Sequence, residues 1–269
     1  MPEGHTLHRL AGVHGELFAG HEVEVSSPQG RFAANAKVLD GVVFERAEAH
    51  GKHLFHHYAD DRVVHVHLGL YGTFTEAELP VLEPRGQVRM RVVGPTHWTD
   101  LRGPISCELL TPEEADVVRA RLGPDPLRAD ADPERAWQRI SRSKSSIAAL
   151  LMDQKLLAGV GNVYRAEVLF RHGVEPMTPG RSLGRENWEL IWADLVELMA
   201  DGVRAGRIDT VRDEHLPEVT GRAPRQDRHG GEVYVYRRAG MPCLVCGTEV
   251  RMNDLAGRKL YWCPTCQPG

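Results

Sequence analysis

Residues 155–170 read KLLAGVGNVYRAEVLF and follow directly on SSIAALLMDQ, a stretch with the spacing of a helix. The turn before the next helical stretch takes about eight residues, whereas a helix-turn-helix ordinarily uses three or four. Gly159 and Gly161 allow backbone conformations that a side chain would block. Asn162 is expected to cap the following helix, whose N–H groups form an anion site. The segment is either a phosphate-binding turn or a plain helix hairpin with a glycine-rich corner.

Four of the five cysteines lie near the C-terminus in two pairs, Cys243-x-x-Cys246 and Cys263-x-x-Cys266. Two such pairs close a tetrahedral thiolate shell around zinc. Four sulfurs leave no open coordination position, so we expect one structural Zn²⁺ that folds a segment too small to build its own core. A redox dithiol or a disulfide pair is the alternative. Cys107 lies outside the cluster and is expected to be a buried strand residue.

The first hundred or so residues alternate apolar with polar side chains between Gly, Pro and Asp, which is typical of strands. We expect an antiparallel β-sandwich there, with a helix near Thr6–Leu17 running ahead of it. The Pro- and acid-rich stretch 122–134 is the best linker candidate, and the polar stretch 209–231 is expected to be a flexible loop. Helices are expected to open at Asp132–Pro133, Ser145 and Asn162 and to include a long amphipathic one over 186–206.

The chain begins Met1-Pro2-Glu3-Gly4. Small residues after the initiator Met permit its removal, which leaves Pro2 with a free secondary amine. An α-amino group titrates near about 7.7–8.0, so roughly a tenth is free base at neutral pH, far more than for a lysine. Attack of this amine on a sugar C1′ gives a cationic iminium, which acidifies C2′–H and favours strand elimination. Glu3 can move the protons. Many proteins begin Met-Pro, so the tetrapeptide alone is a weak signal.

MPEG at the start, Gly51-Lys52, LAGVGNVYRAEVLF and VYRRAGMPCLVC…GRKLYWCPTCQ together resemble the formamidopyrimidine-DNA glycosylase/endonuclease VIII family, with its endonuclease VIII branch favoured. The resemblance covers all three segments of the chain in the expected order. It implies an α+β fold with a catalytic N-terminal antiparallel β-sandwich over 1–124, a helical helix–two-turn–helix domain over 125–225 and a zinc-finger β-hairpin over 226–269. It also implies that DNA binds in the cleft between the domains.

The resemblance implies roles for single residues. Pro2 is the Schiff-base nucleophile and Glu3 the acid/base catalyst. Lys52 matches a hairpin lysine that contacts the phosphate of the damaged nucleotide and assists catalysis. Taken alone, a lysine or arginine at such places is usually a solvated surface residue, and the joint match overturns that interpretation. Asn162 and Arg258 match residues on phosphates next to the lesion, and Arg258 is also matched as catalytic. His67 resembles the family's strand-end phosphate contact.

Enzymes of this kind take the target nucleotide out of the stack, so a side chain must fill the gap. Leu70 and Tyr71 follow an apolar strand and resemble the wedge of the endonuclease VIII branch, although they could instead be core residues. Arg102 lies in a stretch, Asp100-Leu101-Arg102-Gly103, that faintly resembles the second wedge loop of the guanine-directed branch. In that position Arg102 would read the orphan base.

Two departures from the family pattern matter. His5-Thr6 stands where the family usually has Pro-Glu, so a second acid near the nucleophile is missing. Gly69 replaces a polar residue at the start of the wedge, which weakens any prediction of opposite-base preference. A run of histidines could suggest a second metal site, but their alternation on strands predicts that they are split between two faces. These histidines are His50, His53, His56, His57, His65 and His67.

Charge and composition are compatible with a DNA partner. The net charge is −4, but 139–171 holds six bases against two acids and 222–259 eight against four. Such stretches can follow a phosphate backbone, and ordinary surface scatter is the alternative. No apolar run approaches the roughly 20 residues of a membrane span, and the N-terminus is not a signal peptide. We therefore expect a bacterial cytoplasmic, nucleoid-associated protein without a membrane partner.

These observations predict a bifunctional DNA glycosylase/AP lyase of base excision repair. It would remove oxidised bases, pyrimidines favoured, through a Schiff base on Pro2, followed by β,δ-elimination. Its partner would be double-stranded DNA containing damaged bases or abasic sites, bound by a monomer. The alternatives are action on oxidised guanine or formamidopyrimidines, mainly AP-lyase activity, or, from another class, a non-catalytic zinc protein that binds damaged DNA. The Pro2-Glu3 pair with Lys52 favours an enzyme over the non-catalytic zinc protein, because a protein that only binds DNA needs no amine at residue two.

Overall fold

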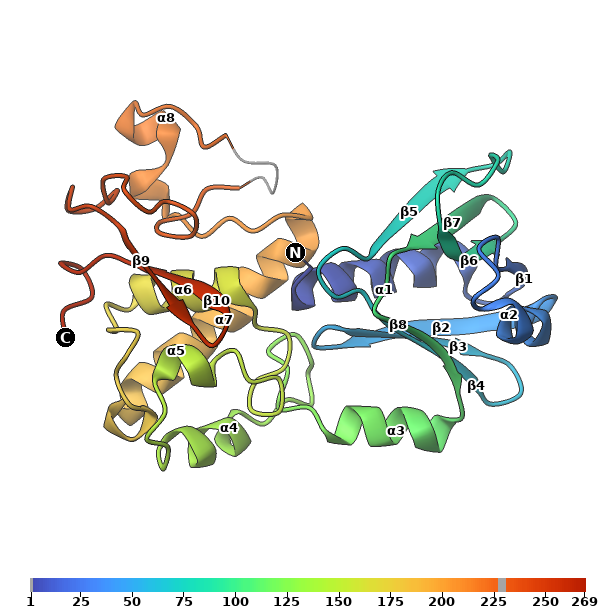
Figure 1. Ribbon diagram of the computed structural model, residues 1–269, viewed down its shortest axis with the longest axis horizontal. Helices are drawn as coiled ribbons and strands as arrows, with labels where there is room; N and C mark the ends of the chain where they lie inside the picture. Colours follow the sequence, from blue (N-terminus) through green and yellow to red (C-terminus); the bar gives the residue numbers. More distant parts are fainter. Residues whose placement is uncertain (1, 227–230) are drawn as a thin grey trace. The chain divides into compact units, whose positions relative to one another are not determined.

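The structure is a computed structural model that describes residues 2–226 and 231–269. The chain divides into two compact units, Met1–Arg121 and Leu122–Gly269 (Figure 1). The first unit is a sheet with helices, and the second is mainly helical with a two-stranded hairpin near its end. Within the described ranges, no helix combines the length and the apolar character that crossing a lipid bilayer requires.

The first unit is built on one antiparallel sheet of eight strands in the order β5-β7-β6-β1-β2-β3-β4-β8. β1 joins the two halves, because its residues 21–23 pair with β2 and its residues 24–26 pair with β6. The strands are β1 (His21–Ser26), β2 (Val42–His50), β3 (His53–Tyr58), β4 (Arg62–His67), β5 (Thr73–Glu78), β6 (Val88–Val93), β7 (His97–Arg102) and β8 (Ser106–Leu110).

α1 (Gly4–Phe18) is the helix expected near Thr6–Leu17, and it packs in one core with both halves of the sheet. Leu7, Ala11 and Phe18 lie on its buried face at helical spacing. They share the core with strand residues from the two halves, such as Phe44 on β2 and Val92 on β6. The two layers expected as a sandwich are thus the halves of a single sheet that encloses α1.

The other face of β3 and β4 is covered by α3 (Pro112–Ala120), while a short helix, α2 (Ala33–Leu39), follows β1. α3 begins at a capping box in which Thr111 and Glu114 satisfy each other's backbone amides. Its Ala115 packs against Phe55 and Val63. Because both of their faces are covered, β3 and β4 are buried nearly throughout. Cys107 is a buried residue of β8, as expected.

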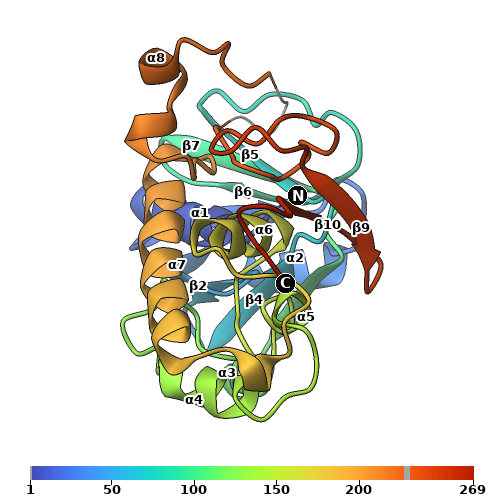
Figure 2. The same ribbon diagram turned by 90° about the vertical axis from the view of Figure 1, so that its left-hand side faces the viewer.

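The second unit has two apolar cores, and β10 of its hairpin contributes a side chain to each, Leu260 to one and Tyr261 to the other. Figure 2 shows the long helix α7 running beside α6. α7 contributes Trp188, Ile191 and Leu195 from one side, and α6 packs beside it. Leu260 of β10 lies in the same core, so the hairpin is attached to the helices by apolar packing. The elements are α4 (Pro133–Ile140), α5 (Ile147–Leu150), α6 (Asn162–Arg171), η1 (Gly180–Ser182), α7 (Arg185–Ala205), η2 (Asp213–His215), α8 (Pro217–Thr220), β9 (Arg251–Leu255) and β10 (Arg258–Trp262).

Three expected helix starts have different outcomes. Asp132 caps α4 by accepting from the Glu134 amide, with Pro133 as the first helical residue, as predicted. The prediction for Ser145 is wrong, because α5 has only four residues and Ser146 occupies the cap position without a side-chain bond. The capping role of Asn162 is also wrong: Gly161 is the N-cap, and Asn162 is the first helical residue with its side chain bonded elsewhere.

The linker candidate 122–134 begins at the boundary between the units but is not a loose connection. Leu122–Pro126 is buried, and the Gly123 amide donates to the Gln154 carbonyl at 2.9 Å. A side chain at Gly123 would overlap the backbone of Leu156. The start of this stretch is therefore packed into the long turn of the second unit.

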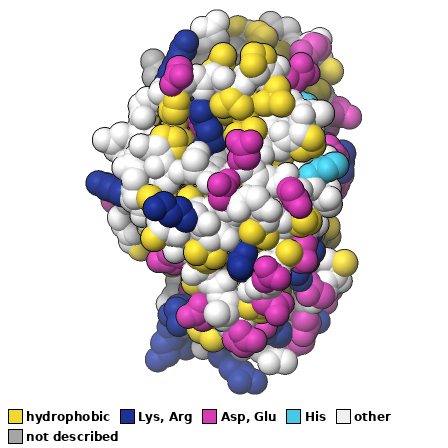
Figure 3. Space-filling view, turned by 90° about the vertical axis from the view of Figure 1, so that its right-hand side faces the viewer, with side chains coloured by type: hydrophobic (Ala, Val, Ile, Leu, Met, Phe, Trp, Pro, Cys, Tyr) yellow, Lys and Arg dark blue, Asp and Glu magenta, His cyan; other side chains and the backbone are white. Residues whose placement is uncertain are grey.

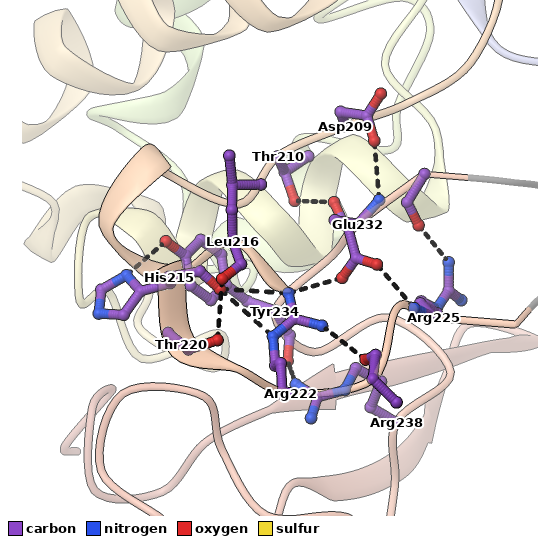
Figure 4. A network of polar contacts seen from close by, with 12 residues as sticks. Asp209, Thr210, His215, Leu216, Thr220, Arg222, Arg225, Glu232, Tyr234 and Arg238 are labelled. Carbon is purple, nitrogen blue, oxygen red and sulfur yellow. Dashed lines mark hydrogen bonds and ion pairs between the residues drawn. The ribbon is translucent and has the colours of Figure 1, made fainter. Parts of the chain in front are cut away.

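The stretch 209–231 is more structured than the flexible loop expected there, although residues 227–230 lie outside the described part. It contains η2 and α8, and its ends meet at Glu232 (Figure 4). The Glu232 amide donates to Asp209 Oδ1 at 2.8 Å, and its carboxylate forms an ion pair with Arg222, with Oε2 2.6 Å from Nη2. Polar side chains within the stretch supply the partners that a solvated loop would find in water.

Candidate active site

Glu3 immediately precedes α1 and is fully buried, with an extended backbone at φ −116° and ψ −180°. Its carbonyl accepts a hydrogen bond from the Thr6 amide at 2.9 Å, so the first turn of α1 fixes the Glu3 backbone. Pro2 is half-buried. Glu3 therefore places a buried carboxyl group directly after Pro2 in the chain.

His5 stands where the family pattern has a proline before an acid, and its imidazole is buried. Burial is the main cause that lowers the pKa of His5 to about 4. The imidazole is therefore neutral at pH 7, with Nε2 3.3 Å from Thr6 Oγ1. An imidazole cannot replace a carboxyl group, so Glu3 is the acidic residue within positions 2–6.

Lys52 lies in the turn between β2 and β3, where His50 pairs with His53 and Gly51 adopts φ 58°. Burial, and after it the charge of Lys52, lowers the pKa of His67 at the end of β4. His67 pairs across β3 and β4 with His53, which follows Lys52 in the chain. The structure therefore brings together the two residues of the first unit that were expected at phosphates.

Two further histidines support this surface. His53 Nδ1 lies 2.8 Å from His65 Nε2, and the ring centroids of His53 and His67 are 4.8 Å apart. Burial, followed by the charge of His65, lowers the pKa of His53 to about 3, so its imidazole is neutral at pH 7. Sequence reasoning did not single out His53 and His65 as neighbours of Lys52. The pairing of β3 with β4, which sets His53 opposite His67, is the signal that identifies them.

The strand histidines divide between two faces of the sheet, as their alternation predicts. His56 points away from the Lys52 surface and into the core, where its Nε2 lies 2.9 Å from His14 Nδ1. The other nitrogen of His14 lies 3.1 Å from Glu76 Oε1. Among the described residues, the grouping of His, Cys, Asp and Glu with metal-ligand spacing is the four-cysteine cluster. The histidines thus form polar networks on each face.

Leu70 and Tyr71 lie in the turn between β4 and β5 and are 42% and 85% exposed. This exposure excludes the alternative that they are core residues. Arg102 ends β7, and its guanidinium donates to Asp100 Oδ2 at 2.7 Å and to the Arg85 carbonyl at 2.9 Å. These bonds hold the Arg102 side chain on its own sheet.

Gln154 closes the long turn that precedes α6. Its side-chain amide donates to the carbonyls of Met152 and Val160 at 3.0 and 2.9 Å, and its oxygen accepts from the Gly159 amide at 3.0 Å. Gly159 adopts φ 87°, a left-handed conformation that favours glycine. Sequence reasoning missed Gln154, whose position just before a glycine-rich turn was the available signal.

Asn162 connects the start of α6 to β10. Its Nδ2 donates to the Lys259 carbonyl at 2.9 Å, and its Oδ1 accepts from the guanidinium of the buried Arg165. Arg165 Nη2 also donates to the Lys259 carbonyl at 3.2 Å. Lys259 follows Arg258, so the two residues of the second unit expected at phosphates are held next to each other. An arginine within an apolar helix was the overlooked signal for Arg165.

Glu167 lies on α6 after Asn162 and Arg165, and it anchors the segment that leads into the cysteine cluster. Its buried carboxylate accepts from the amides of Tyr234, Val235 and Tyr236 at 2.7, 2.9 and 2.8 Å. It also accepts from the Thr210 hydroxyl at 2.5 Å. A single side chain thus fixes both ends of the stretch 210–236 on α6. Sequence reasoning missed it, because its partners are backbone amides.

The four C-terminal cysteines have the arrangement of a zinc site. Their sulfur atoms lie within 4.8 Å of one another, with Cys243 and Cys266 3.8 Å apart and Cys246 and Cys263 3.5 Å apart. A tetrahedral zinc with bonds of about 2.3 Å sets neighbouring sulfurs roughly 3.8 Å apart. The residues fit one structural zinc, and four thiolates leave no position for a substrate or water.

Arg258 stands at the tip of the hairpin that joins β9 to β10. Ala256 and Gly257 form the turn with φ values of 49° and 71°, and Arg258 pairs with Leu255 across the strands. Arg258 is exposed, as is Lys259 beside it. The hairpin thus presents positive side chains to solvent while Leu260 on the same strand is in the core.

Comparison with known proteins covers most of the chain. The family described as formamidopyrimidine-DNA glycosylase N-terminal domain matches residues 1–104, and the formamidopyrimidine-DNA glycosylase H2TH domain matches residues 122–213. The zinc finger found in FPG and IleRS matches residues 240–269. The chain is also similar in fold to the Lactococcus lactis Fpg in complex with DNA containing an abasic site, with a TM-score of 0.79, 21% identity and coverage of 99% of this chain and 100% of that one.

Individual relatives match over nearly their whole lengths. Endonuclease 8 1 of Mycobacterium tuberculosis is 57% identical, covering 99% of this chain and 100% of the relative. A probable endonuclease 8 2 of Streptomyces coelicolor is 34% identical, with 100% and 95% covered. The formamidopyrimidine-DNA glycosylase of Parasynechococcus marenigrum is 32% identical, with 99% of each covered. On these matches, this chain belongs to the formamidopyrimidine-DNA glycosylase/endonuclease VIII family.

Proposed function

We propose that this protein is a bifunctional DNA glycosylase/AP lyase of base excision repair that removes oxidised bases, oxidised pyrimidines before oxidised guanine. The observation that carries the proposal is the Pro2-Glu3 pair, with a buried carboxyl fixed at the start of α1 beside a half-buried proline. The similarity over full length to endonuclease 8 1 favours the pyrimidine branch. Similarity to a formamidopyrimidine-DNA glycosylase keeps oxidised guanine as the second candidate.

The chemistry begins at the amine of Pro2 after removal of Met1. Its nitrogen forms a bond to C1′ of the damaged nucleotide, the glycosidic bond breaks, and the bonding pair leaves with the base, which takes up a proton. The amine then loses its proton, and the C1′–O4′ bond breaks with its pair leaving on O4′, which takes up a proton, so that an iminium forms between Pro2 and C1′. The iminium acidifies C2′–H, and loss of that proton expels the 3′ phosphate, with δ-elimination of the 5′ phosphate to follow. Glu3 moves the protons that these steps transfer.

The remaining site residues bind the DNA backbone and fill the gap. Lys52 and His67 contact the phosphate of the damaged nucleotide, and Asn162 and Arg258 contact phosphates next to it. Arg258 also assists catalysis through this positioning. Leu70 and Tyr71 enter the stack where the nucleotide leaves it, and Arg102 faces the orphan base, within the reach that its bonds to Asp100 and Arg85 allow.

The zinc has a structural role, because its four thiolates complete the coordination shell. We place the catalytic sheet domain at 1–124, the helical domain at 125–225 and the zinc finger at 226–269. The protein acts as a monomer on double-stranded DNA that contains damaged bases or abasic sites, at the bacterial nucleoid.

Borohydride trapping tests the proposal on oligonucleotides that each carry one defined lesion. A covalent adduct should form on oxidised thymine or uracil faster than on oxidised guanine opposite cytosine. Pro2→Gly should slow trapping, and a preparation that retains Met1, verified by mass spectrometry, should not trap. Glu3→Gln should bind DNA normally but lose base excision.

The outcomes separate the candidates. Faster excision of oxidised guanine would move the protein to the other branch, and trapping at abasic sites alone would make it mainly a lyase. Efficient trapping with Met1 retained would refute Pro2 as the nucleophile. Damage-specific binding without any adduct would identify a non-catalytic DNA-binding protein.

A further inference from the structure

A column of aromatic rings leads from the interior of the first unit to the half-buried His67 at the end of β4. His65 stacks on the buried Phe55, with ring centroids 5.1 Å apart and ring planes 24° apart. His53 stacks on His65 at 5.1 Å and 15°, and its ring centroid lies 4.8 Å from that of His67. The hydrogen bond of 2.8 Å between His53 Nδ1 and His65 Nε2 joins the middle of the column. The His67 imidazole is therefore packed against rings that are themselves fixed.

A hydroxyl group of the next strand lies on the same face as His67. Ser106 of β8 stands opposite His67 in the register of the two strands, and residues paired in this way share one face of a sheet. The Ser106 hydroxyl is buried, and no described residue forms a hydrogen bond with it. A buried polar group without a partner costs free energy, so a partner is expected in another state of the protein. A protonated imidazole has two N–H groups, one for Ser106 and one for a ligand.

The surroundings of the column keep its imidazoles neutral in the free protein. Burial lowers the pKa of His53, His65 and His67, and the positive charge of Lys52 lowers the pKa of His67 further. Glu108 acts in the opposite direction on His65, but its carboxylate is largely exposed and lies 3.7 Å from Nδ1. The other charged or titratable side chains that face the column come from β2 and α3: His50 and Glu48, paired with His53 and Phe55, and Arg119, which lies over the Phe55 ring.

A DNA phosphate bound at Lys52 reverses this balance. Its negative charge offsets that of the lysine and favours the protonated form of a nearby imidazole. A protonated His67 forms a charge-assisted hydrogen bond to the phosphate, which is stronger than a bond from a neutral donor. Because the complex then binds a proton that the free protein does not bind, the affinity for DNA depends on pH.

We propose that the side chains around His67 position it to take up one proton when a DNA phosphate binds at Lys52. These positioning residues are His53, His65 and Ser106. The inference rests on the proposed function, which places Lys52 and His67 at the phosphate of the damaged nucleotide. The ring column holds His67 neutral until that phosphate arrives, and Ser106 then accepts from the second N–H of the imidazolium.

Calorimetry in buffers of different ionisation enthalpy counts the protons taken up on binding. The probe is duplex DNA with a tetrahydrofuran in place of the damaged nucleotide, which offers the phosphate but no group at C1′ for the amine to displace. We expect the wild type to take up about one proton per DNA bound at about pH 6.5. The affinity should rise by up to about tenfold per pH unit as pH falls from the pKa of His67 in the complex to its lower pKa in the free protein. The slope of log K against log salt should be steeper by about one at low pH, because one more phosphate contact is charged.

Variants separate the titrating residue from those that position it. His67→Gln should lose the proton uptake. His53→Ala opens the His67 imidazole to water, and an imidazole with the ordinary pKa of about 6.5 is already half protonated at that pH, so the uptake should fall to about half. His53→Phe restores the ring packing without a titrating group and should restore the uptake. Ser106→Ala should reduce the uptake without changing the urea midpoint at neutral pH, and His21→Gln, at an exposed position on β1, should behave as the wild type.

NMR of protein labelled with ¹³C at histidine Cε1 reports the same proton at its site. The signal that His67→Gln removes should titrate below the ordinary pKa of 6.5 in the free protein and above it in the complex. The same titration in both states would overturn the inference, as would an uptake that His67→Gln leaves unchanged. Wild-type uptake in both His53→Ala and Ser106→Ala would equally refute the positioning roles. Adducts on damaged DNA together with binding that takes up no proton would leave the proposed function standing, whereas the absence of any adduct would refute the proposed function itself.

Discussion

At the scale of single residues, the neutral histidines around Lys52 determine how much positive charge the β2–β3 turn presents. Burial lowers the pKa of His53 to about 3, and burial together with the charge of Lys52 lowers the pKa of His67. At pH 7 the lysine is therefore the cation of this group. A phosphate brought to it would favour protonation of His67, since a nearby opposite charge stabilises the charged form.

The same histidines make stability depend on pH. The unfolded chain takes up a proton on His53 near its ordinary pKa of 6.5, whereas the folded protein does so only near 3. Between these values the unfolded state binds more protons, so the free energy of unfolding falls as pH falls, by up to about 1.4 kcal/mol per pH unit for this group. Burial lowers the pKa of His5 in the same direction.

His53→Gln should therefore flatten the decline in the free energy of unfolding below pH 6.5 by up to about 1.4 kcal/mol per pH unit. Urea unfolding at a series of pH values between about 7 and 4 measures this slope. His21→Gln, at an exposed position on β1, is the matched control and should keep the wild-type slope. A slope that is unchanged in His53→Gln would contradict the neutral state of His53 in the folded protein.

At the scale of elements, α6 organises the second unit. Asn162 and Arg165 near its start bind the Lys259 carbonyl of β10, and Glu167 binds the amides of Tyr234 to Tyr236. The segment 234–236 before the first cysteine pair and the strand β10 before the second pair are thus both attached to one helix. The position of Arg258 follows from α6 as much as from the zinc.

Glu167→Ala should lower the free energy of unfolding of the second unit by about 3 kcal/mol or more, because three buried amides lose their acceptor. Urea unfolding followed by tryptophan fluorescence measures the change. Glu197→Ala, at an exposed position on α7, should stay within about 0.5 kcal/mol of wild type. Glu167→Gln retains one acceptor oxygen, so its free energy of unfolding should lie between those of Glu167→Ala and the wild type. A wild-type stability for Glu167→Ala would mean that the carboxylate does not hold this segment.

At the scale of the whole molecule, a net charge of −4 coexists with basic segments. One face shows acidic and basic side chains interspersed, with the acidic ones gathered in its lower part (Figure 3). Attraction to DNA must then come from local positive groups such as the exposed Arg258 and Lys259. Binding that depends on a few phosphate contacts releases few counterions and has a modest salt dependence.

Zinc and Arg258 can be separated by their effects on DNA binding. Cys263→Ser should lose the one bound zinc, unfold the finger and abolish binding. Arg258→Ala should keep the zinc but weaken binding to damaged DNA and reduce the slope of log K against log salt by about one. Metal analysis and binding titrations at several salt concentrations measure both.

Arg31→Ala removes an exposed arginine of the first unit and serves as the control, with the wild-type slope expected. Active protein without zinc would contradict the structural role of the metal. An unchanged slope in Arg258→Ala would show that Arg258 does not contact a phosphate.

The sequence by itself determined the features whose signal is local. The Cys-x-x-Cys pairs, the MPEG terminus and the glycine-rich turn before Asn162 each lie within a few residues, and Asp132-Pro133 predicted the start of α4. Spacing and residue type suffice there, because the chemistry of a chelate, an amine or a helix cap depends on neighbours along the chain.

Only the tertiary structure decided the features that join distant segments. Asn162 bonds to a carbonyl 97 positions along the chain instead of capping its own helix, and Glu167 binds amides 67 to 69 positions away. Ile105 lies over Gly69 because the register of β4 with β8 brings the turns at 69–72 and 103–105 together. A backbone carbonyl, an amide or the empty space above a glycine leaves no mark in composition or periodicity. Such partners are chosen by packing and hydrogen-bond satisfaction in the folded chain.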